Sequence, residues 1–452
     1  MAKADRDAVL RARKRVPPPG GALLEDTEKM KQKHHRMLCA FCALVILVST
    51  VFPTAAFAEQ PVDAAAAEQT LTRADAAEMQ QADAAVTVLT ESEQYQEMDT
   101  DARKDAALAQ LDTLAAKGLV EKDSIYADEE NGMVSFRYPC GVLGGILLTE
   151  PEDETLDEEN AETETASNAL FLGCPPDLGA EMQKSRAALL RRTENQAVEK
   201  FGTAVIYYAF DNTINSSRFP YYAYMQGFWS ALGLETKINI HVTVADLKKM
   251  GNYNVSVLSA HGSYYTYSYG KFLKRTRTEP IMLLTEESTF GKDLRYGFDL
   301  LAHRVIKVNG MYCVTSDFFR NAYKGGKLSN TIVYSETCEF LGVDGSEDNA
   351  MADALLSGGA QAVIGYVNNV YTVYSRSMLW DTINHLIMGQ NVGQALEHAK
   401  ATYGEDDLIW YHAQGGRRPH AAASYAVLYG NSQAALHVPE SNRSMFSADL
   451  AA

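Results

Sequence analysis

The chain has 452 residues, of which 46% are hydrophobic and 10% aromatic, so it is long enough to form two domains with a substantial buried core. Acidic residues outnumber basic residues by 58 to 41 and the formal net charge is -17, which excludes a nucleic-acid-binding surface, because such a surface needs clustered lysine and arginine. The 6 cysteines are too few for a disulfide scaffold and lack the spacing of metal ligands, so the sequence predicts neither a metal site nor a cofactor.

The N-terminal segment has the features of an export signal. Basic residues at 31–36 precede an apolar run at 37–52, and Ala-Phe-Ala at 56–58 provides a cleavage site of small residues. We interpret residues 1–58 as a secretory signal peptide. An uncleaved membrane anchor is the alternative, because residues 37–58 are just long enough to span a bilayer. Under either interpretation the rest of the chain is exported, and is either secreted or held at the cell surface. Only the N-terminal segment would then contact the membrane.

Three segments of different composition follow. Residues 59–98 are rich in alanine and acids and predict a flexible or loosely helical lead. Residues 99–150 predict a small α+β region, in which an amphipathic helix ends near Gly118 and a β-meander follows. The acid-rich segment 151–168 repels itself and predicts a linker, although a solvated loop within a single domain fits the same composition.

Residues 169–437 alternate short apolar runs with helical patterns. Strands that alternate with helices of this size predict right-handed crossovers and a mainly parallel sheet covered on both faces. The expected fold is therefore α/β. Residues 438–452 are assigned to a C-terminal tail.

Two apolar runs end in chemically active residues. The run VSVLSAHG at 255–262 delivers His261, and the run TIVYSETCEF at 331–340 delivers Cys338, with Glu336 two positions earlier. If the two strands are neighbours in one parallel sheet, their carboxyl ends place an imidazole beside a thiol. Such a pair forms a thiolate and an imidazolium, and the thiolate is a nucleophile near neutral pH. A single cysteine at a strand end is more often a small buried apolar residue, and the coincidence of both groups favours catalysis.

An apolar strand ending in His-Gly, followed by one ending in acid-x-Cys, resembles the caspase-like cysteine peptidases, which include clostripain, gingipain, legumain, separase and the caspases. Legumain-like chains carry Glu-Ala-Cys and clostripain-like chains Asp-Ala-Cys, where this chain has Glu-Thr-Cys at 336–338. GGAQAVIGY at 358–366 and ASYAVLYGN at 423–431 resemble the gingipain and CHAT branches. The resemblance spans 203–431 and implies a caspase-like three-layer sandwich. The interval from the His-Gly to the Cys is longer than in caspases.

The resemblance implies an endopeptidase with a Cys-His dyad. Cys338 attacks the scissile carbonyl, His261 protonates the leaving amine, and the backbone amides of Gly262 and Cys338 hold the oxyanion. Glu336 lies on the same strand face as Cys338, and a carboxylate beneath the nucleophile predicts cleavage after Lys or Arg. An internal arginine that neutralises this carboxylate, such as Arg295 or Arg304, is the alternative, which implies a legumain-like preference for Asn.

Two further residues are candidates for substrate contact. Asp211 follows the apolar run at 203–210, and Tyr264 belongs to an aromatic stretch that follows the His-Gly pair and offers rings for stacking on an extended peptide. The expected function is an exported cysteine endopeptidase that acts on a protein or peptide substrate and processes its own lead after Lys184, Arg191 or Arg192. The alternatives are a catalytically inactive exported module that binds peptides, and another type of cysteine enzyme on the same scaffold.

Overall fold

The structure is a computed structural model. It describes residues 70–148, 198–210, 219–270, 274–413 and 423–446, together with a few positions between 183 and 191. All of these residues belong to one compact unit, Val62–Ala452. Within them, no helix is long and apolar enough to cross a membrane. The predicted signal segment at 1–58, the predicted linker at 151–168 and Asp211 lie outside the described residues.

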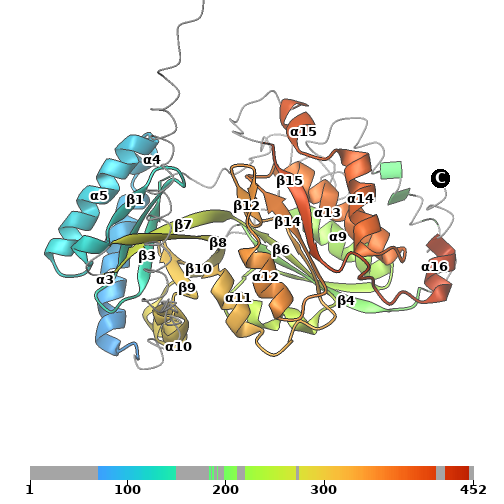
Figure 1. The fold of residues 1–452 in the computed structure, drawn as a ribbon, viewed down its shortest axis with the longest axis horizontal. Helices are drawn as coiled ribbons and strands as arrows, with labels where there is room; N and C mark the ends of the chain where they lie inside the picture. The colour runs from blue at the N-terminus through green and yellow to red at the C-terminus, as the bar shows by residue number, and fades with distance from the viewer. Residues whose placement is uncertain are drawn as a thin grey trace, which may run out of the picture. The chain divides into compact units, whose positions relative to one another are not determined.

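A six-stranded sheet carries the predicted nucleophile and base (Figure 1). From edge to edge its strands are β5 (Leu234–Asn239), β4 (Gly202–Ala209), β6 (Val255–Ala260), β11 (Ile332–Ser335), β14 (Ala362–Val367) and β15 (Tyr425–Gly430). The first five are parallel, and β15 is antiparallel to β14. The strand order reverses between β4 and β6. In open α/β sheets, ligands bind near such a reversal, at the carboxyl ends of the strands.

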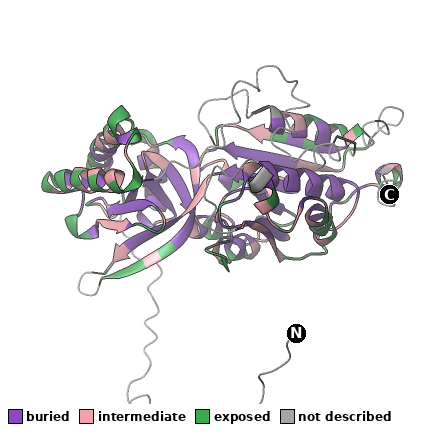
Figure 2. Cartoon of the chain, turned by 90° about the horizontal axis from the view of Figure 1, so that it is seen from above, coloured by how far each residue is buried: buried purple, intermediate pink, exposed green. Residues whose placement is uncertain are grey.

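Helices cover both faces of this sheet, so it is the middle of three layers. One face packs against α9 (Phe219–Ala231), α13 (Thr372–Ile387) and α14 (Val392–Tyr403), and the other against η2 (Leu247–Asn252), α11 (Ser316–Ala322) and α12 (Ala350–Ser357). Alternate strand residues enter different cores, with Ile206 and Tyr208 on the first face and Val205 and Tyr207 on the second. Figure 2 shows the strands buried between the helices. The prediction of an α/β fold is confirmed.

A seven-stranded mixed sheet lies in the same unit. In order its strands are β1 (Tyr126–Asp128), β2 (Met133–Arg137), β3 (Leu143–Leu147), β9 (Val305–Val308), β10 (Met311–Thr315), β8 (Arg275–Glu287) and β7 (Gly262–Tyr269). The helices that pack near it are α3 (Arg73–Thr90), α5 (Thr100–Ala116) and α10 (Phe290–Leu301). The remaining elements are α4 (Glu93–Gln96), η1 (Lys122–Ser124), β12 (Gly342–Val343), β13 (Ser346–Glu347), α15 (Leu408–Ala413) and α16 (Glu440–Phe446).

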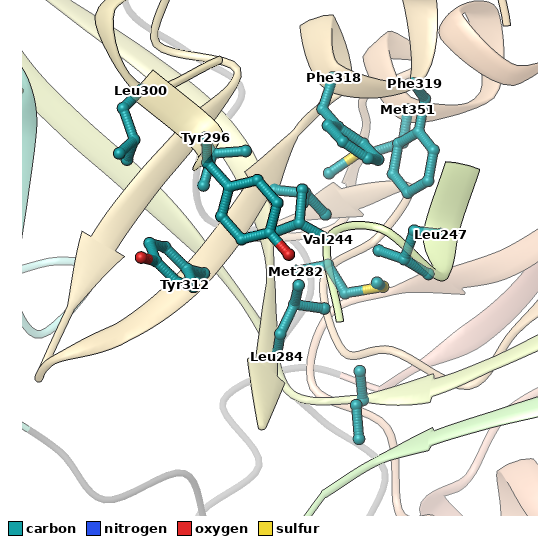
Figure 3. Close-up of a cluster of buried hydrophobic side chains, with 14 of the residues drawn as sticks. Val244, Leu247, Met282, Leu284, Tyr296, Leu300, Tyr312, Phe318, Phe319 and Met351 are labelled. Atoms are coloured by element: carbon teal, nitrogen blue, oxygen red, sulfur yellow. The ribbon is translucent and has the colours of Figure 1, made fainter. Parts of the chain in front are cut away.

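One hydrophobic core continues between the two sheets. Figure 3 shows Met282 and Leu284 of β8 beside Tyr296 of α10 and Phe318 of α11. Val205 of the six-stranded sheet belongs to the same cluster of buried side chains. The two sheets are therefore parts of one folded body and stabilise each other by shared burial.

Residues 59–98 were predicted to be flexible or loosely helical, and the structure instead has a regular, capped helix, α3, within them. Thr72 caps this helix in a capping box with Asp75, and Met79 and Val86 are buried against the shared core. Asp83 of α3 also forms a salt bridge with Lys307 of β9. A regular helix was not predicted because its buried face includes alanines, which give only a weak helical periodicity of hydrophobic residues.

The small α+β region at 99–150 was predicted as a separate part, and the structure joins it to the rest. Its last strand, β3, pairs in parallel with β9, with Gly144 opposite Lys307. The hydroxyl of Tyr265 on β7 donates a hydrogen bond to the carbonyl oxygen of Gly144 at 2.8 Å. Local sequence patterns do not show pairing between strands that are so distant in the chain. The region at 99–150 was therefore predicted to be separate from the rest of the structure.

The predicted C-terminal tail at 438–452 contains α16. Asn442 of this helix is buried, and its side chain accepts a hydrogen bond from the amide of Glu199 and donates one to the carbonyl oxygen of Glu199. Two hydrogen bonds to backbone groups fix the helix against the entry to β4. The tail is therefore ordered over the seven residues of α16.

Candidate active site

Two parallel strands in the middle of the six-stranded sheet carry the predicted base and nucleophile. The strands β6 and β11 are hydrogen-bonded neighbours, with Ser335 opposite Leu258. Both strands are buried along their whole length. Continued past the strand ends at the same offset, this register sets Cys338 opposite His261.

The two chain segments touch just beyond the strand ends. A Cβ atom added to Gly262 would lie 2.1 Å from the carbonyl oxygen of Cys338 and 2.5 Å from Cγ2 of Thr337, so the approach requires glycine. His261, Gly262 and Cys338 are partly exposed, whereas the strands that lead to them are buried. The imidazole of His261 and the thiol of Cys338 therefore lie together at the carboxyl ends of two central strands, where the sheet is accessible to solvent.

His261 is held from two sides. Its ring meets the ring of Phe210 edge to face, with centroids 5.1 Å apart and 81° between the planes. Its carbonyl oxygen accepts a hydrogen bond from the amide of Leu283 at 2.9 Å. The first contact restrains the ring, since edge-to-face pairs favour a defined orientation, and the second fixes the backbone to β8.

Cys338 begins a tight turn. Its sulfur lies 3.9 Å from the carbonyl oxygen of Val370, at the entry to α13. The next residue, Glu339, has φ of 55°, a left-handed conformation that is uncommon for a residue with a side chain. The amide of Glu339 donates to the carbonyl oxygen of Asn368 at 3.0 Å, which holds the turn. Such strained positions concentrate at functional sites.

Two other described cysteines differ from Cys338 in their environment. Among the described residues, none of the three is in a disulfide bond. Burial raises the pKa of the Cys140 thiol to about 11 and raises the pKa of the fully buried Cys313 still further. A thiol with a raised pKa gives little thiolate at neutral pH, so neither residue is a good nucleophile.

Glu336 lies in the interior beneath Cys338 and is only 2% exposed. Its carboxylate accepts hydrogen bonds from three hydroxyl groups, those of Tyr222 at 3.1 Å, Ser259 at 2.5 Å and Ser375 at 3.4 Å. A carboxylate enclosed in this way does not reach a substrate side chain. The structure therefore argues against the predicted substrate contact of Glu336 and favours a role in holding β6, β11, α9 and α13 together.

An internal arginine accompanies this carboxylate, but it is Arg376 and neither Arg295 nor Arg304, and Arg304 instead forms a salt bridge with Asp299. Burial raises the pKa of Glu336 to about 7, and the positive charge of Arg376 and the hydroxyl donors lower it in part. Arg376 is buried on α13, with its guanidinium carbon 3.7 Å from the centre of the Tyr221 ring. The sequence pattern gave no sign of Arg376, because it comes from a helix far along the chain.

Tyr264, the other described candidate for substrate contact, is buried on β7. Its hydroxyl donates a hydrogen bond to Asp348 at 3.0 Å. Burial first, then the charges of Asp348 and Glu339, raise the pKa of Tyr264. Burial and the charge of Asp344 raise the pKa of Glu339 to about 7. Three carboxyl groups that follow Cys338 in the chain, which we call the acidic rim (Glu339, Asp344 and Asp348), therefore interact with Tyr264 or with one another.

The chain matches no protein-family model and no curated protein. What the site can do follows from its own groups. A thiol supplies a nucleophile, an imidazole supplies and accepts protons, and a rim of carboxyl groups attracts cations. Together these groups suit transfer of an acyl group from a substrate with a basic side chain.

We expect Glu336→Gln to change how stability depends on pH. A raised carboxyl pKa means that the folded chain holds the proton more tightly than the unfolded chain, so wild type loses stability as the pH rises from about 4.5 to about 7. Glutamine has no proton to lose. Denaturation by urea should show the variant gaining about 3 kcal/mol relative to wild type over this range. A stability difference that stays constant with pH would contradict the burial of an ionisable Glu336.

Proposed function

We propose that this chain is a cysteine endopeptidase with Cys338 as its nucleophile and His261 as its proton carrier. The observation that carries the proposal is the parallel pairing of β6 with β11, which brings both residues to one accessible edge. The close approach of Gly262 to Cys338 supports it, because it leaves two backbone segments side by side around the thiol. The same edge is where open α/β sheets bind their ligands.

The reaction follows from these groups. His261 takes the thiol proton, and the thiolate of Cys338 attacks the scissile carbonyl carbon while the carbonyl electrons move to oxygen. The amides of Gly262 and Cys338 donate hydrogen bonds to this oxyanion. The imidazolium then gives its proton to the leaving nitrogen, and the C–N bond breaks. Water, deprotonated by His261, hydrolyses the thioester and regenerates the thiol.

The order of strands supports a caspase-like sandwich for residues 169–437. Numbered along the chain, the sheet reads second, first, third, fourth, fifth, sixth, with only the sixth strand antiparallel. The proposed base follows the third strand and the nucleophile the fourth. Export of this domain and processing of its own lead are part of the proposal, on the strength of the N-terminal export pattern and the basic residues at 184, 191 and 192.

A preference for Lys or Arg is supported by the acidic rim. Glu339 follows the nucleophile directly, and its raised pKa reflects both burial and the nearby charge of Asp344. A basic substrate side chain beside this carboxyl group favours its ionised form and gains a charge-assisted hydrogen bond. The rim thus takes the role that the sequence assigned to Glu336.

We expect this preference to depend on pH. Because Glu339 ionises near pH 7, the ratio of kcat/KM for an Arg substrate to that for the matched Asn substrate should rise about tenfold between pH 5.5 and 8. Taking the ratio cancels titration of the dyad. Glu339→Gln should flatten the ratio, whereas Glu287→Gln, at an exposed position on β8, should leave it unchanged. A ratio in wild type that is flat with pH would remove Glu339 from substrate recognition.

Digestion of a complex peptide mixture, with the cut sites identified by mass spectrometry, tests the function. We expect new termini after Lys and Arg, loss of all cleavage after alkylation with iodoacetamide, and no effect of a serine-directed fluorophosphonate. Cleavage that survives alkylation would exclude a thiol nucleophile. Binding of peptides without any cleavage would identify an inactive binding module instead.

A further inference from the structure

A cluster of two histidines and one aspartate lies between α13 and α14, apart from the dyad. Asp381 and His385 are one turn apart on α13, and His398 faces them from α14. Every residue of α13 from Val373 to Ile387 is buried. A carboxylate and an imidazole inside such a helix need partners, because burying polar groups without them costs free energy.

The three side chains converge on a small volume. Nδ1 of His398 lies 2.7 Å from Oδ2 of Asp381, and Nε2 of His385 lies 3.8 Å from Oδ1 of the same carboxylate. Three candidate ligand atoms, one from each residue, lie within 4.8 Å of one another. A tetrahedral zinc ion with bonds of about 2.0–2.1 Å needs ligand atoms about 3.3 Å apart, so the two measured distances bracket the requirement. The third pair, between the two histidines, lies within 4.8 Å, so binding requires the side chains to shift by up to about 1.5 Å.

A neighbouring side chain supplies the outer partner of His385. His385 is only 6% exposed, and its ring interacts with the side chain of Gln390. The backbone amide of Gln390 donates to the carbonyl oxygen of His385 at 3.0 Å, which keeps the two residues together. If Nε2 of His385 binds a metal, Nδ1 carries the proton and can donate it to Gln390. Metal-bound histidines commonly make such an outer hydrogen bond.

We propose that Asp381, His385 and His398 bind a Zn²⁺ ion. Two imidazoles with one carboxylate suit zinc and disfavour calcium and magnesium, which take oxygen ligands. The side chain of His398 is 47% exposed, so the ion enters from solvent on that side and keeps a water as its fourth ligand. The sequence predicted no metal because the ligands come from two helices without a recognised spacing.

The ion links α13 to α14. Ser375 contacts Glu336 beneath the proposed nucleophile, and Arg376 neutralises it; both lie on the same helix, about 7.5–9 Å before Asp381 at 1.5 Å per residue. Zinc therefore holds the helix that supports the proposed active site, without entering its chemistry. This inference does not depend on peptidase activity, because it concerns a different set of residues.

Zinc binding should be measured on the full chain in a Cys338→Ala background, which removes the partly exposed thiol of Cys338 as a competing ligand. After treatment with a chelator and its removal, Zn²⁺ alone is titrated against a chromophoric zinc indicator. We expect one equivalent bound with a Kd of about 1 µM or less, and a rise in Tm on saturation, because a ligand that binds only the folded state stabilises it.

The deciding comparison uses two exposed histidines. His398→Ala should weaken binding of the one Zn²⁺ at the proposed site by at least about 100-fold and abolish the rise in Tm, since loss of one of three ligands removes most of the affinity. His437→Ala, at an exposed position outside the cluster, should keep both. Histidines elsewhere in the chain contribute equally to both variants and cancel.

Co²⁺ gives an independent readout. Bound to this site, it should show the visible absorption of tetrahedral nitrogen and oxygen ligation, and this absorption should be lost in His398→Ala. Equal zinc affinity in His398→Ala and His437→Ala would overturn the proposal. So would the absence of a tightly bound Zn²⁺ in the Cys338→Ala protein.

Discussion

Cys338→Ala is expected to lower kcat/KM for peptide cleavage by about 10⁴- to 10⁶-fold, because it removes the nucleophile and leaves only substrate binding and the oxyanion donors. The fold should be retained, since Cys338 is partly exposed at a strand end and alanine fits the space. Steady-state cleavage of an Arg-containing fluorogenic peptide provides the measurement. Cys140→Ala is the matched control and should keep full activity, because its thiol lies outside the site and has a raised pKa.

His261→Ala should cost about as much as loss of the thiol. The double variant should then be no worse than either single variant, because residues that act as a unit are not additive in their kinetic effects. Losses that multiply would indicate two independent roles and contradict a dyad. If Cys338→Ala kept more than a few per cent of the cleavage activity, another residue would have to be the nucleophile.

Gly262→Ala is expected to lower kcat at least about 100-fold, because a displacement of about 1 Å at a reacting group can cost that much. The added Cβ would lie 2.1 Å from the carbonyl oxygen of Cys338, so the two backbone segments must separate. That separation moves the thiol away from the imidazole and misplaces both proposed oxyanion donors. The change should also destabilise the fold by about 1–3 kcal/mol, as overpacking does.

The control for this variant is Gly291→Ala. A Cβ at Gly291 meets no atom within 4 Å, and the residue lies in the first turn of α10. Alanine there should leave activity unchanged and increase stability slightly, because glycine is a poor helix former. Unchanged kcat in Gly262→Ala would mean that the approach of the two segments has no part in catalysis.

The strands that carry the site were predictable from sequence, because each is an apolar run that stops at small polar residues. The pairing of β6 with β11 was only a condition of the predicted site, because no pattern within either run shows which strands are neighbours. In the structure the Ser259 hydroxyl of β6 donates to the Glu336 carboxylate just beyond β11, which joins the two strands near their ends.

The environment of Glu336 was not predictable. Two of its partners, Tyr222 and Ser375, come from α9 and α13, and only the folded chain brings them to one carboxylate. The acidic rim was missed for a different reason. The turn after Cys338 sets Glu339 beside Asp344, and it depends on a left-handed residue that no sequence pattern marks.

Covalent capture by an arginyl peptide electrophile, such as an acyloxymethyl ketone, decides between this enzyme and an inactive module. Peptide mapping by mass spectrometry should find the adduct on Cys338, with Cys140 and Cys313 unmodified, because burial raises the pKa of both of those thiols. The rate of capture should fall by orders of magnitude in His261→Ala. An adduct on another residue, or capture of Cys338 that is equally fast without the imidazole, would contradict a thiol activated by His261.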